Sequence, residues 1–443
     1  MVTVTLDELE ARDATGNRVV DHAHLVDLKL VTGCIEFLTQ LPDSFASALP
    51  NLRTAFFSNC GFKQFPAVLA RTRLERVAFK DNGMHTLAQD CLPSSTLRWL
   101  ILTNNCITRL PACIGRCPRL EKCMLAGNQI MDLPIEMARC ERLALLRISA
   151  NEFEGGLPPF LLRMPALAFL AFAGNPTNAA RDAQEEEEKR VLPRVAWDQL
   201  RIGKALGEGA SGVICQAVCT EQTLGFQNAD VAVKMFKGAV TSDGWPEEEM
   251  RAAIAAGQHE NLITPVAEVV NHPEGAHGLV LPLIPAIYKN LGLPPSMDTC
   301  SRDVFVQGLR VSAEKAAGIL KGVASACAHL HGRGISHGDL YAHNILVDFE
   351  EDLRDAKHEF GEVLLGDFGA AYRYDITDKE AAGLWEKLEV LAFAHLVEDV
   401  MGLVDAKNSP MMHSLAKLHV RCSVRDVASR PSFRNIVDIM AGL

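Results

Sequence analysis

Residues 336–348 read SHGDLYAHNILVD. Within this stretch, Asp339 and Asn344 stand five residues apart, after a histidine and before a short apolar run. A carboxylate can accept or orient a proton, and an amide oxygen can hold Mg²⁺. Because such a pair also occurs by chance in surface turns, it indicates a catalytic loop only if the rest of the chain supplies the other groups that such a loop needs.

A glycine-rich stretch, LGEGASGV at 206–213, supplies one of these groups. Glycines let backbone N–H groups approach a phosphate without a Cβ in the way. A dinucleotide-binding fold would require a helix to begin at the third glycine, but here the β-branched, alternating VICQAVC follows. The next alternating stretch, VAVKMF, carries Lys234. The sequence therefore predicts a glycine-rich hairpin with a cationic side chain on the next strand, placed to contact nucleotide phosphates.

A further carboxylate lies in VLLGDFGAA, which contains Asp367, Phe368 and Gly369. It can bind a divalent cation that bridges nucleotide phosphates. Each motif is weak when taken alone. Their order along the chain, with workable separations, is very improbable by chance.

With these motifs, residues 197–443 resemble a eukaryotic-type protein kinase domain, a bilobal α+β fold whose N-lobe ends near residue 284. The resemblance implies ATP and Mg²⁺ as cofactors, Asp339 and Lys234 as catalytic residues, and Asn344 and Asp367 as metal ligands. The residues that it assigns to the nucleotide are Leu206, Gly207, Glu208, Gly209, Ala210, Ser211, Gly212, Val213, Ala232 and Lys234.

The resemblance also implies an acidic partner for Lys234. Kinases of this kind place it shortly before a histidine, and Glu249 lies ten residues before His259. We therefore expect Glu249 to pair with Lys234, with Glu248 as the alternative. The negative charges of the remaining glutamates would interact favourably with the positive end of the helix dipole at the start of the predicted helix.

Several positions depart from the kinase pattern. Gly338 replaces the arginine that pairs with a phosphorylated activation loop in many kinases, Tyr341 replaces a lysine, and no APE motif follows Asp367. Glu389 stands where an aspartate normally stabilises the catalytic-loop backbone. Arg430 would need a new partner, for which Glu380 and Glu386 are candidates. We expect an activity that is not switched by activation-loop phosphorylation in the usual way.

Three functions stay open at this point. The first is a protein kinase acting on Ser/Thr hydroxyls. The second is a pseudokinase-type scaffold that binds nucleotide or partners without transfer, which Gly338, Tyr341 and the missing APE motif favour and the presence of Lys234, Asp339 and Asp367 opposes. The third is a small-molecule kinase of the aminoglycoside phosphotransferase type, which has a similar loop.

The first part of the chain is repetitive. Six copies of the pattern L-x-x-L-x-L-x-x-N/C begin at leucines 22, 23, 23, 23 and 24 residues apart, from LRTAFFSNC (52–60) to LAFLAFAGN (167–175), and a degenerate copy begins at Leu25. They resemble leucine-rich repeats, which implies a stacked α/β horseshoe solenoid over residues 1–178. The final Asn or Cys of each copy can bind the backbone of the adjoining turn, and Leu-Pro dipeptides begin the return limb.

The outward strand positions of the repeats carry large side chains in most copies, with basic residues among them. Clustered apolar side chains at a surface usually mark a contact site. We expect a protein partner at this concave face, or the chain's own second domain. The residues are Phe56, Trp99, Ile101, Met124, Leu145 and Phe169.

The composition is that of a globular protein with a net charge of −11 that is concentrated after residue 178. This charge argues against a nucleic-acid binder. The 13 cysteines include no CxxC pair, which favours free thiols in a reducing compartment. No secretory signal or membrane-spanning run is evident, so a cytoplasmic location is expected. Residues 179–196, with a run of four glutamates, predict a linker.

The whole arrangement resembles a family of soluble leucine-rich-repeat protein kinases found in bacteria and plants. The stretches that carry the likeness are SDGWPEEEM, NHPEG, NLGLPPS and HGDLYAHNIL.

Overall fold

The computed structural model describes residues 26–31, 40–177, 192–220, 229–299, 301–349, 361–405 and 408–443. The chain divides into two compact units, Met1–Leu167 with Asn175–Thr177, and Ala168–Gly174 with Asn178–Leu443. This division differs from the expected first domain, 1–178, by grouping Ala168–Gly174 with the second unit. The domain limits expected from the sequence stay predictions, and most of the expected linker lies outside the described residues.

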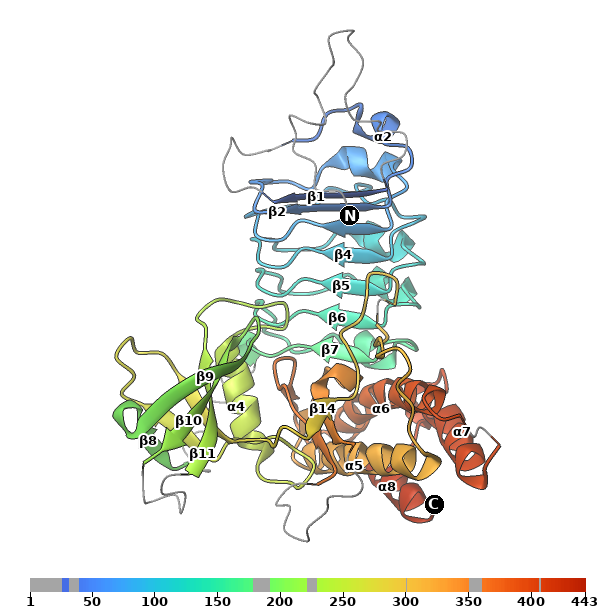
Figure 1. Cartoon of the computed structure of the whole chain (residues 1–443). Helices are drawn as coiled ribbons and strands as arrows, with labels where there is room; N and C mark the ends of the chain where they lie inside the picture. Colours follow the sequence, from blue (N-terminus) through green and yellow to red (C-terminus); the bar gives the residue numbers. More distant parts are fainter. Residues whose placement is uncertain are drawn as a thin grey trace. The chain divides into compact units, whose positions relative to one another are not determined.

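The first unit contains a parallel sheet in which each strand pairs with the next one along the chain (Figure 1). Its strands are β1 (Asp27–Val31), β2 (Thr54–Ser58), β3 (Arg76–Ala78), β4 (Trp99–Ile101), β5 (Lys122–Met124) and β6 (Leu145–Arg147). Corresponding positions of the repeats pair directly, as Arg76 with Trp99 and Trp99 with Lys122. The sequence period therefore sets the strand register.

Short helices form the return limbs between these strands. They are α2 (Phe45–Ala48) and the 3₁₀ helices η2 (Ala67–Arg71), η3 (Ala112–Arg116), η4 (Ile135–Arg139) and η5 (Pro159–Arg163). Pro111, Pro134 and Pro158 stand at the N-caps of η3, η4 and η5. A proline suits this position because the N–H that it lacks would find no partner inside the helix. The prediction that the Leu-Pro dipeptides begin the return limb is confirmed.

The leucine that begins each repeat lies in the core. Leu52, Leu74, Leu97, Leu120, Leu143 and Leu167 are all at most 1% exposed. Each buried leucine contributes roughly 1.5–3 kcal/mol to folding. At one end of the unit, Phe57, Phe62 and Phe79 extend this core, with ring centroids 4.9–5.5 Å apart.

Five of the six repeats end in an asparagine that links the repeat to its neighbours, as the sequence predicted. Asn128 accepts a hydrogen bond from the Ile107 N–H (3.1 Å) and donates to the carbonyl oxygens of Leu102 (2.9 Å) and Leu125 (2.8 Å). Asn82, Asn105, Asn151 and Asn175 make equivalent bonds. Because these backbone groups are buried, the amides satisfy donors and acceptors that water cannot reach.

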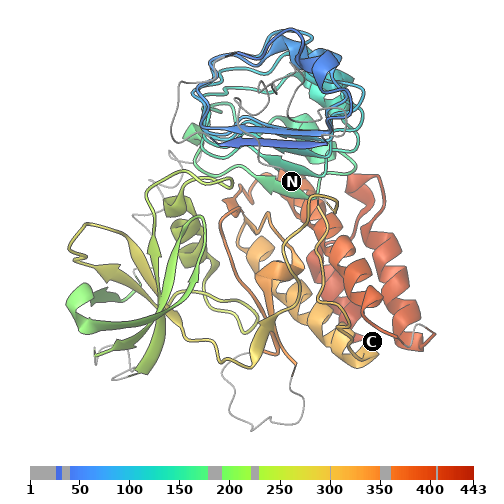
Figure 2. The same cartoon turned by 45° about the horizontal axis from the view of Figure 1, so that its top comes forward.

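The second unit begins with strand β7 (Phe169–Ala171) and contains a six-stranded sheet in the order β8-β12-β13-β11-β10-β9. These strands are β8 (Arg194–Ala196), β9 (Leu200–Glu208), β10 (Gly212–Cys219), β11 (Ala229–Phe236), β12 (Ala267–Val270) and β13 (Gly278–Pro282). The 3₁₀ helix η6 (Trp197–Gln199) precedes β9, and helix α4 (Pro246–Ala256) lies beside the sheet (Figure 2). Val195, Val231, Val233 and Val280 form part of the core of this sheet.

The rest of the second unit is mainly helical (Figure 2). Its helices are α5 (Ala313–Gly332), η7 (Ala342–Asn344), α6 (Lys379–Gly402), α7 (Pro410–Cys422), η9 (Val427–Ser429) and α8 (Phe433–Ala441). The side chains of Ser312, Asp378, Ser409 and Ser432 cap α5, α6, α7 and α8. Two small sheets complete the unit, β14 (Tyr288–Asn290) with β16 (Ile345–Asp348) and β17 (Val363–Leu365), and β15 (Ile335–Ser336) with β18 (Tyr372–Arg373).

The cysteines in the described ranges are free thiols, and most are buried. Burial raises the pKa of Cys117 and of Cys422 to about 12. Such thiols behave as small apolar side chains at neutral pH. Within the same ranges, no helix is both long and apolar enough to span a lipid bilayer.

We predict that Asn128→Ala lowers the free energy of unfolding of the first unit by about 1–3 kcal/mol, because it leaves buried backbone groups of three residues without their partner. Hydrogen exchange of amides in β4–β6 measures the loss. The control is Gln129→Ala, which removes an exposed polar side chain at the next position. Equal protection in Asn128→Ala and wild type would show that the amide does not join the repeats.

Candidate active site

The glycine-rich stretch forms the predicted hairpin. Strands β9 and β10 pair antiparallel with Glu208 opposite Val213, and the Gly209 N–H donates to the Gly212 carbonyl at 2.9 Å. A Cβ added to Gly207 or Gly209 would meet no atom within 4 Å, whereas one added to Gly212 would clash with the Met235 carbonyl. Gly212 is therefore needed for packing, and the first two glycines leave an open backbone surface that suits close approach of a phosphate.

Lys234 lies on β11, opposite Ile214 of β10, and its ammonium forms an ion pair with Glu249 of α4. Glu249 is 4% exposed, and Glu248 pairs instead with Arg251 at 2.7 Å. Burial raises the pKa of Glu249, Lys234 opposes this shift, and the Asp367 carboxylate adds to it. The structure thus joins Lys234 to Glu249 rather than to Glu248, and it places Asp367 within electrostatic range of the pair.

Asp339 and Asn344 are held against each other. The Asn344 amide Nδ2 donates to the Asp339 backbone oxygen (2.9 Å) and to its carboxylate Oδ2 (3.0 Å). The Gly366 N–H donates to the Asn344 carbonyl at 3.0 Å, and β16 pairs with β17. These bonds connect the loop that carries Asp339 to the residues that directly precede Asp367.

Glu389 of α6 holds the backbone of this loop. Its Oε1 accepts from the Gly338 N–H (2.7 Å), and its Oε2 accepts from the His337 N–H (3.1 Å) and contacts His331 Nε2 (2.6 Å). Burial alone would raise the pKa of Glu389, but the interactions with His331, His337 and Gly338 outweigh burial and hold this pKa below its usual range. The prediction that Glu389 stabilises the catalytic-loop backbone is confirmed.

Asp367 has a positive φ of 60°, and its Oδ1 accepts from the Gly369 N–H at 3.1 Å. The following Phe368 is buried, with its ring 5.6 Å from that of His337. His337 Nε2 also bonds the Gly366 carbonyl at 2.9 Å. The contacts of Gly366 before Asp367 and of Phe368 and Gly369 after it therefore fix the position of the exposed Asp367 carboxylate.

The groups predicted from separate motifs converge. The pKa of His343 is lowered by burial but raised more by Asp303, Asp339 and Asp367, so both predicted site carboxylates lie near one imidazole. A Cβ added to Gly369 would lie 3.2 Å from Asp367 Oδ1 and 3.9 Å from Glu249 Oε2, so Asp367 also lies beside the partner of Lys234. One region therefore contains the cation, the two carboxylates and the amide that the sequence predicted.

This region fits a hard divalent cation. Asp367 presents a carboxylate. Because the side-chain nitrogen Nδ2 of Asn344 donates to Asp339, the side-chain oxygen Oδ1 of Asn344 points away from Asp339. Oxygen ligands of this kind are the ones that Mg²⁺ prefers. Across the ranges that the structure describes, no cluster of three His, Cys, Asp or Glu side chains suited to a metal is present.

Asp303 is a site residue that the sequence analysis missed. Its Oδ1 contacts His343 Nδ1 at 2.7 Å, and its Oδ2 accepts from the Ala342 N–H. It lies in an irregular stretch far upstream of the loop that it supports, so no local spacing indicated it.

The segment after Asp367 is short, as predicted, and passes through the two-residue strand β18 before α6 begins at Lys379. Tyr374 is buried, its hydroxyl contacts His331 Nδ1 at 2.8 Å, and burial raises its pKa. Arg430 is also buried and donates to the carbonyl oxygens of Val424 (2.9 Å) and Lys387 (3.0 Å). Glu386, one of its two proposed partners, accepts from the Phe433 N–H at 2.7 Å.

The residues expected at the concave face differ in exposure. Phe56, Ile101 and Met124 are partly exposed, whereas Trp99, Leu145 and Phe169 are buried. The Arg76 Cζ atom lies 5.5 Å from the centre of the Trp99 ring, and the Lys122 Nζ atom lies 5.1 Å from it. Only part of the expected apolar set therefore remains open to a partner.

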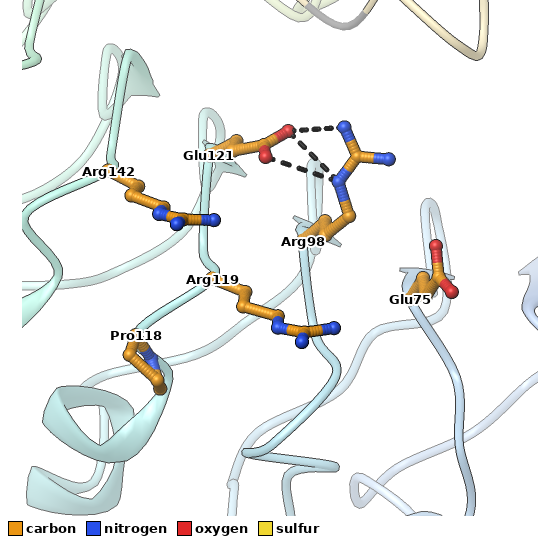
Figure 3. A pocket seen from close by; sticks show the side chains of 6 residues that line it. All are labelled: Glu75, Arg98, Pro118, Arg119, Glu121 and Arg142. Atoms are coloured by element: carbon orange, nitrogen blue, oxygen red, sulfur yellow. Dashed lines mark hydrogen bonds and ion pairs between the residues drawn. The ribbon is translucent and has the colours of Figure 1, made fainter.

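A pocket in the first unit is unrelated to these residues (Figure 3). It is lined by Glu75, Arg98, Pro118, Arg119, Glu121 and Arg142. Arg98 and Glu121 form a paired contact with N–O distances of 2.8–3.2 Å. No side chain predicted for phosphate transfer lines this pocket.

Residues 200–390 match the family model described as "Protein tyrosine and serine/threonine kinase". The match spans the hairpin, Lys234, Glu249, the Asp339 loop and Asp367. The chain therefore contains a protein kinase domain.

Three curated proteins are similar to this chain at low identity. "Probable serine/threonine-protein kinase gdt4" of Dictyostelium discoideum is 26% identical over 171 residues, which cover 37% of this chain and 9% of that protein. "Ephrin type-A receptor 6" of Rattus norvegicus is 27% identical over 221 residues, which cover 43% of this chain and 21% of that protein. The protein of the same name from Mus musculus is 26% identical over 237 residues, which cover 46% of this chain and 23% of that protein. The chain thus spans less than a quarter of the length of each of these relatives.

We predict that Glu389→Gln lowers the free energy of unfolding of the second unit by about 1.5–3 kcal/mol, because it removes the negative charge of the carboxylate that accepts the buried His337 and Gly338 N–H groups. Denaturation by urea, followed through amides of α5 and α6, measures the change. Because the pKa of Glu389 is lowered on folding, its contribution is complete at neutral pH. The difference between wild type and variant therefore shrinks as the pH falls below about 4.3, the ordinary pKa of glutamate.

The control is Glu314→Gln, at an exposed carboxylate in the first turn of α5. A similar loss in both variants, or a difference that grows on acidification, would contradict the role given to Glu389.

Proposed function

We propose that the protein kinase domain of this chain transfers the γ-phosphate of ATP to Ser/Thr hydroxyls of proteins. The observation that carries the proposal is the convergence of the Lys234–Glu249 ion pair, the Asp339–Asn344 couple and Asp367 in one region. A family-model match to kinases of both hydroxyl classes and a Ser/Thr kinase relative support it.

Each group has a defined task in this proposal. Lys234, oriented by Glu249, contacts the α and β phosphates, while backbone N–H groups near Gly207 and Gly209 cover the phosphates. Asp339 accepts or orients the proton of the attacking hydroxyl. Asn344 and Asp367 would hold Mg²⁺, which would supply charge neutralisation at the phosphates.

A scaffold that binds nucleotide without transfer is the second candidate. The observation that favours it is Tyr341, which replaces a cationic side chain beside Asp339 and is buried. Against it stands the complete set of polar groups at the site.

We predict that purified protein incorporates label from γ-labelled ATP into itself or into a generic protein substrate. Asp339→Asn removes the proton acceptor and Lys234→Met removes the phosphate contact, so each lowers the rate by at least ~10²-fold. Phosphatase treatment of wild type beforehand leaves the rate unchanged, because Tyr374, in the segment after Asp367, is buried against His331.

Equal incorporation by wild type and both variants would indicate a contaminating kinase and refute the transfer activity. Binding of ATP by all three proteins without incorporation would instead establish the scaffold. Loss of activity on phosphatase treatment, with phosphate mapped to Tyr372, Tyr374 or Thr377, would refute the independence from phosphorylation.

We further propose that the repeats are leucine-rich repeats that bind a protein partner or substrate, and that the protein is cytoplasmic. The parallel strands at the repeat period and the linking asparagines support the first proposal. The buried free thiols support a reducing compartment. The remaining exposed part of the expected face is Phe56, Ile101 and Met124.

We predict that Met124→Asp reduces the set of proteins cross-linked to the purified full chain, because it places a charge in the apolar face. The matched control is Met131→Asp, at a methionine that is 64% exposed outside the expected face. Equal loss in both variants, or no loss in either, would contradict recognition by this face.

A further inference from the structure

The segment Ala168–Gly174 lies far from the catalytic loop in sequence but belongs to the same compact unit. Its strand β7 lies beside α6, the helix that carries Glu389 (Figure 1). Phe169, Leu170, Ala171 and Phe172 are each at most 3% exposed. A stretch this deeply buried is fixed by its neighbours, and three of its contacts lie close to Asp339 or just after Asp367.

The first contact is a ring stack next to Asp339. The rings of Phe169 and Tyr341 lie nearly parallel, with centroids 4.0 Å and planes 6° apart. Tyr341 in turn stacks on His343 at 5.2 Å, and its N–H donates to the Asp339 carbonyl at 2.8 Å. Aromatic pairs add about 0.5–1.5 kcal/mol beyond the area that they bury, so the stack restricts the backbone just after Asp339.

The second contact is at Gly338, directly before Asp339. Gly338 has φ of +72°, and a Cβ added there would lie 2.6 Å from both the Leu170 and the Ala370 carbonyl oxygens. Two backbone segments therefore close on this position, and only glycine fits between them. The absence of the usual arginine follows from this packing and is not a sign of decay.

The third contact is at the strand that follows Asp367. Phe172 packs edge-on against Tyr372 at 5.2 Å, and Tyr372 of β18 pairs with Ser336 of β15. The same seven-residue segment thus touches the loop before Asp339, the loop after it, and the strand downstream of Asp367.

We propose that Ala168–Gly174 is the element that positions Asp339 for phosphate transfer, with Phe169 as its main positioning residue. This inference rests on the proposed kinase activity. The segment supplies, from within the chain, the order that a phosphorylated activation loop gives to other kinases. The site would then be competent without modification, and integrity of this segment would be required for turnover.

The test compares steady-state kinetics of Phe169→Leu with those of wild type in the full chain. Rates are normalised to the amount of protein that binds a fluorescent Mg²⁺–ATP analogue. We expect kcat to fall by roughly 10- to 100-fold, the scale on which a small misplacement of a catalytic group acts. We expect KM for ATP to stay close to that of wild type, because the glycine hairpin and Lys234 lie on the six-stranded sheet and not on the loop that the segment contacts.

Three further variants separate positioning from general destabilisation. Phe79→Leu makes the same change at a fully buried phenylalanine of the first unit and leaves kcat unchanged. Phe169→Tyr keeps the ring and retains more of kcat than Phe169→Leu. The double variant Phe169→Leu/Tyr341→Leu loses no more than the more impaired single variant, because both remove one interaction.

Each outcome decides the inference. Wild-type kcat in Phe169→Leu, with an active wild type, overturns the positioning role and leaves the kinase activity standing. An increase in kcat or in use of a protein substrate also overturns it, because the segment would then block the site. No Asp339-dependent transfer in wild type removes both proposals together.

Discussion

A buried carboxylate organises the catalytic region of this protein. Glu389, on the long helix α6, accepts the N–H groups of two consecutive loop residues and contacts His331 of α5. Glu389 thus holds the backbone directly before Asp339, while Asp303 holds the backbone after it through the Ala342 N–H. Because the N–H groups are buried, losing the acceptor would leave them unsatisfied, at about 1–3 kcal/mol each. The positions of Asp339 and of the groups around it follow from this constraint.

Close backbone approach at Gly338 is the complementary constraint. Glu389 holds its N–H from one side, while the carbonyl oxygens of Leu170 and Ala370 exclude any side chain from the other. Gly338 stands where many kinases carry an arginine, and here the position is packed on two sides. The absence of this arginine is compatible with the proposed transfer activity, because in our proposal packing at Gly338, and not a phosphorylated segment, orders the loop.

Much of the fold could be predicted because its signals are local or periodic. The repeat period places each starting leucine in the core and each final asparagine between neighbouring strands, and the glycine hairpin and Lys234 follow from alternation of side chains. The partner of Lys234 could be narrowed to Glu249 or Glu248 only through resemblance, since several glutamates begin that helix. Asp303 could not be found, because it acts through a contact with a loop distant in sequence. Phe169 was expected at a face that contacts a protein partner or the chain's own second domain, but no local signal indicated that it stacks on Tyr341.

The proposed activity requires that one region formed by Lys234, Asn344 and Asp367 binds a nucleotide together with Mg²⁺. Calorimetric titration with ATP, with and without Mg²⁺, tests it directly and requires no substrate. We predict binding that Mg²⁺ strengthens in wild type and that loses this dependence in Asp367→Asn. Absence of ATP binding to the folded protein, or an identical Mg²⁺ effect in Asp367→Asn, would contradict a nucleotide site at these residues.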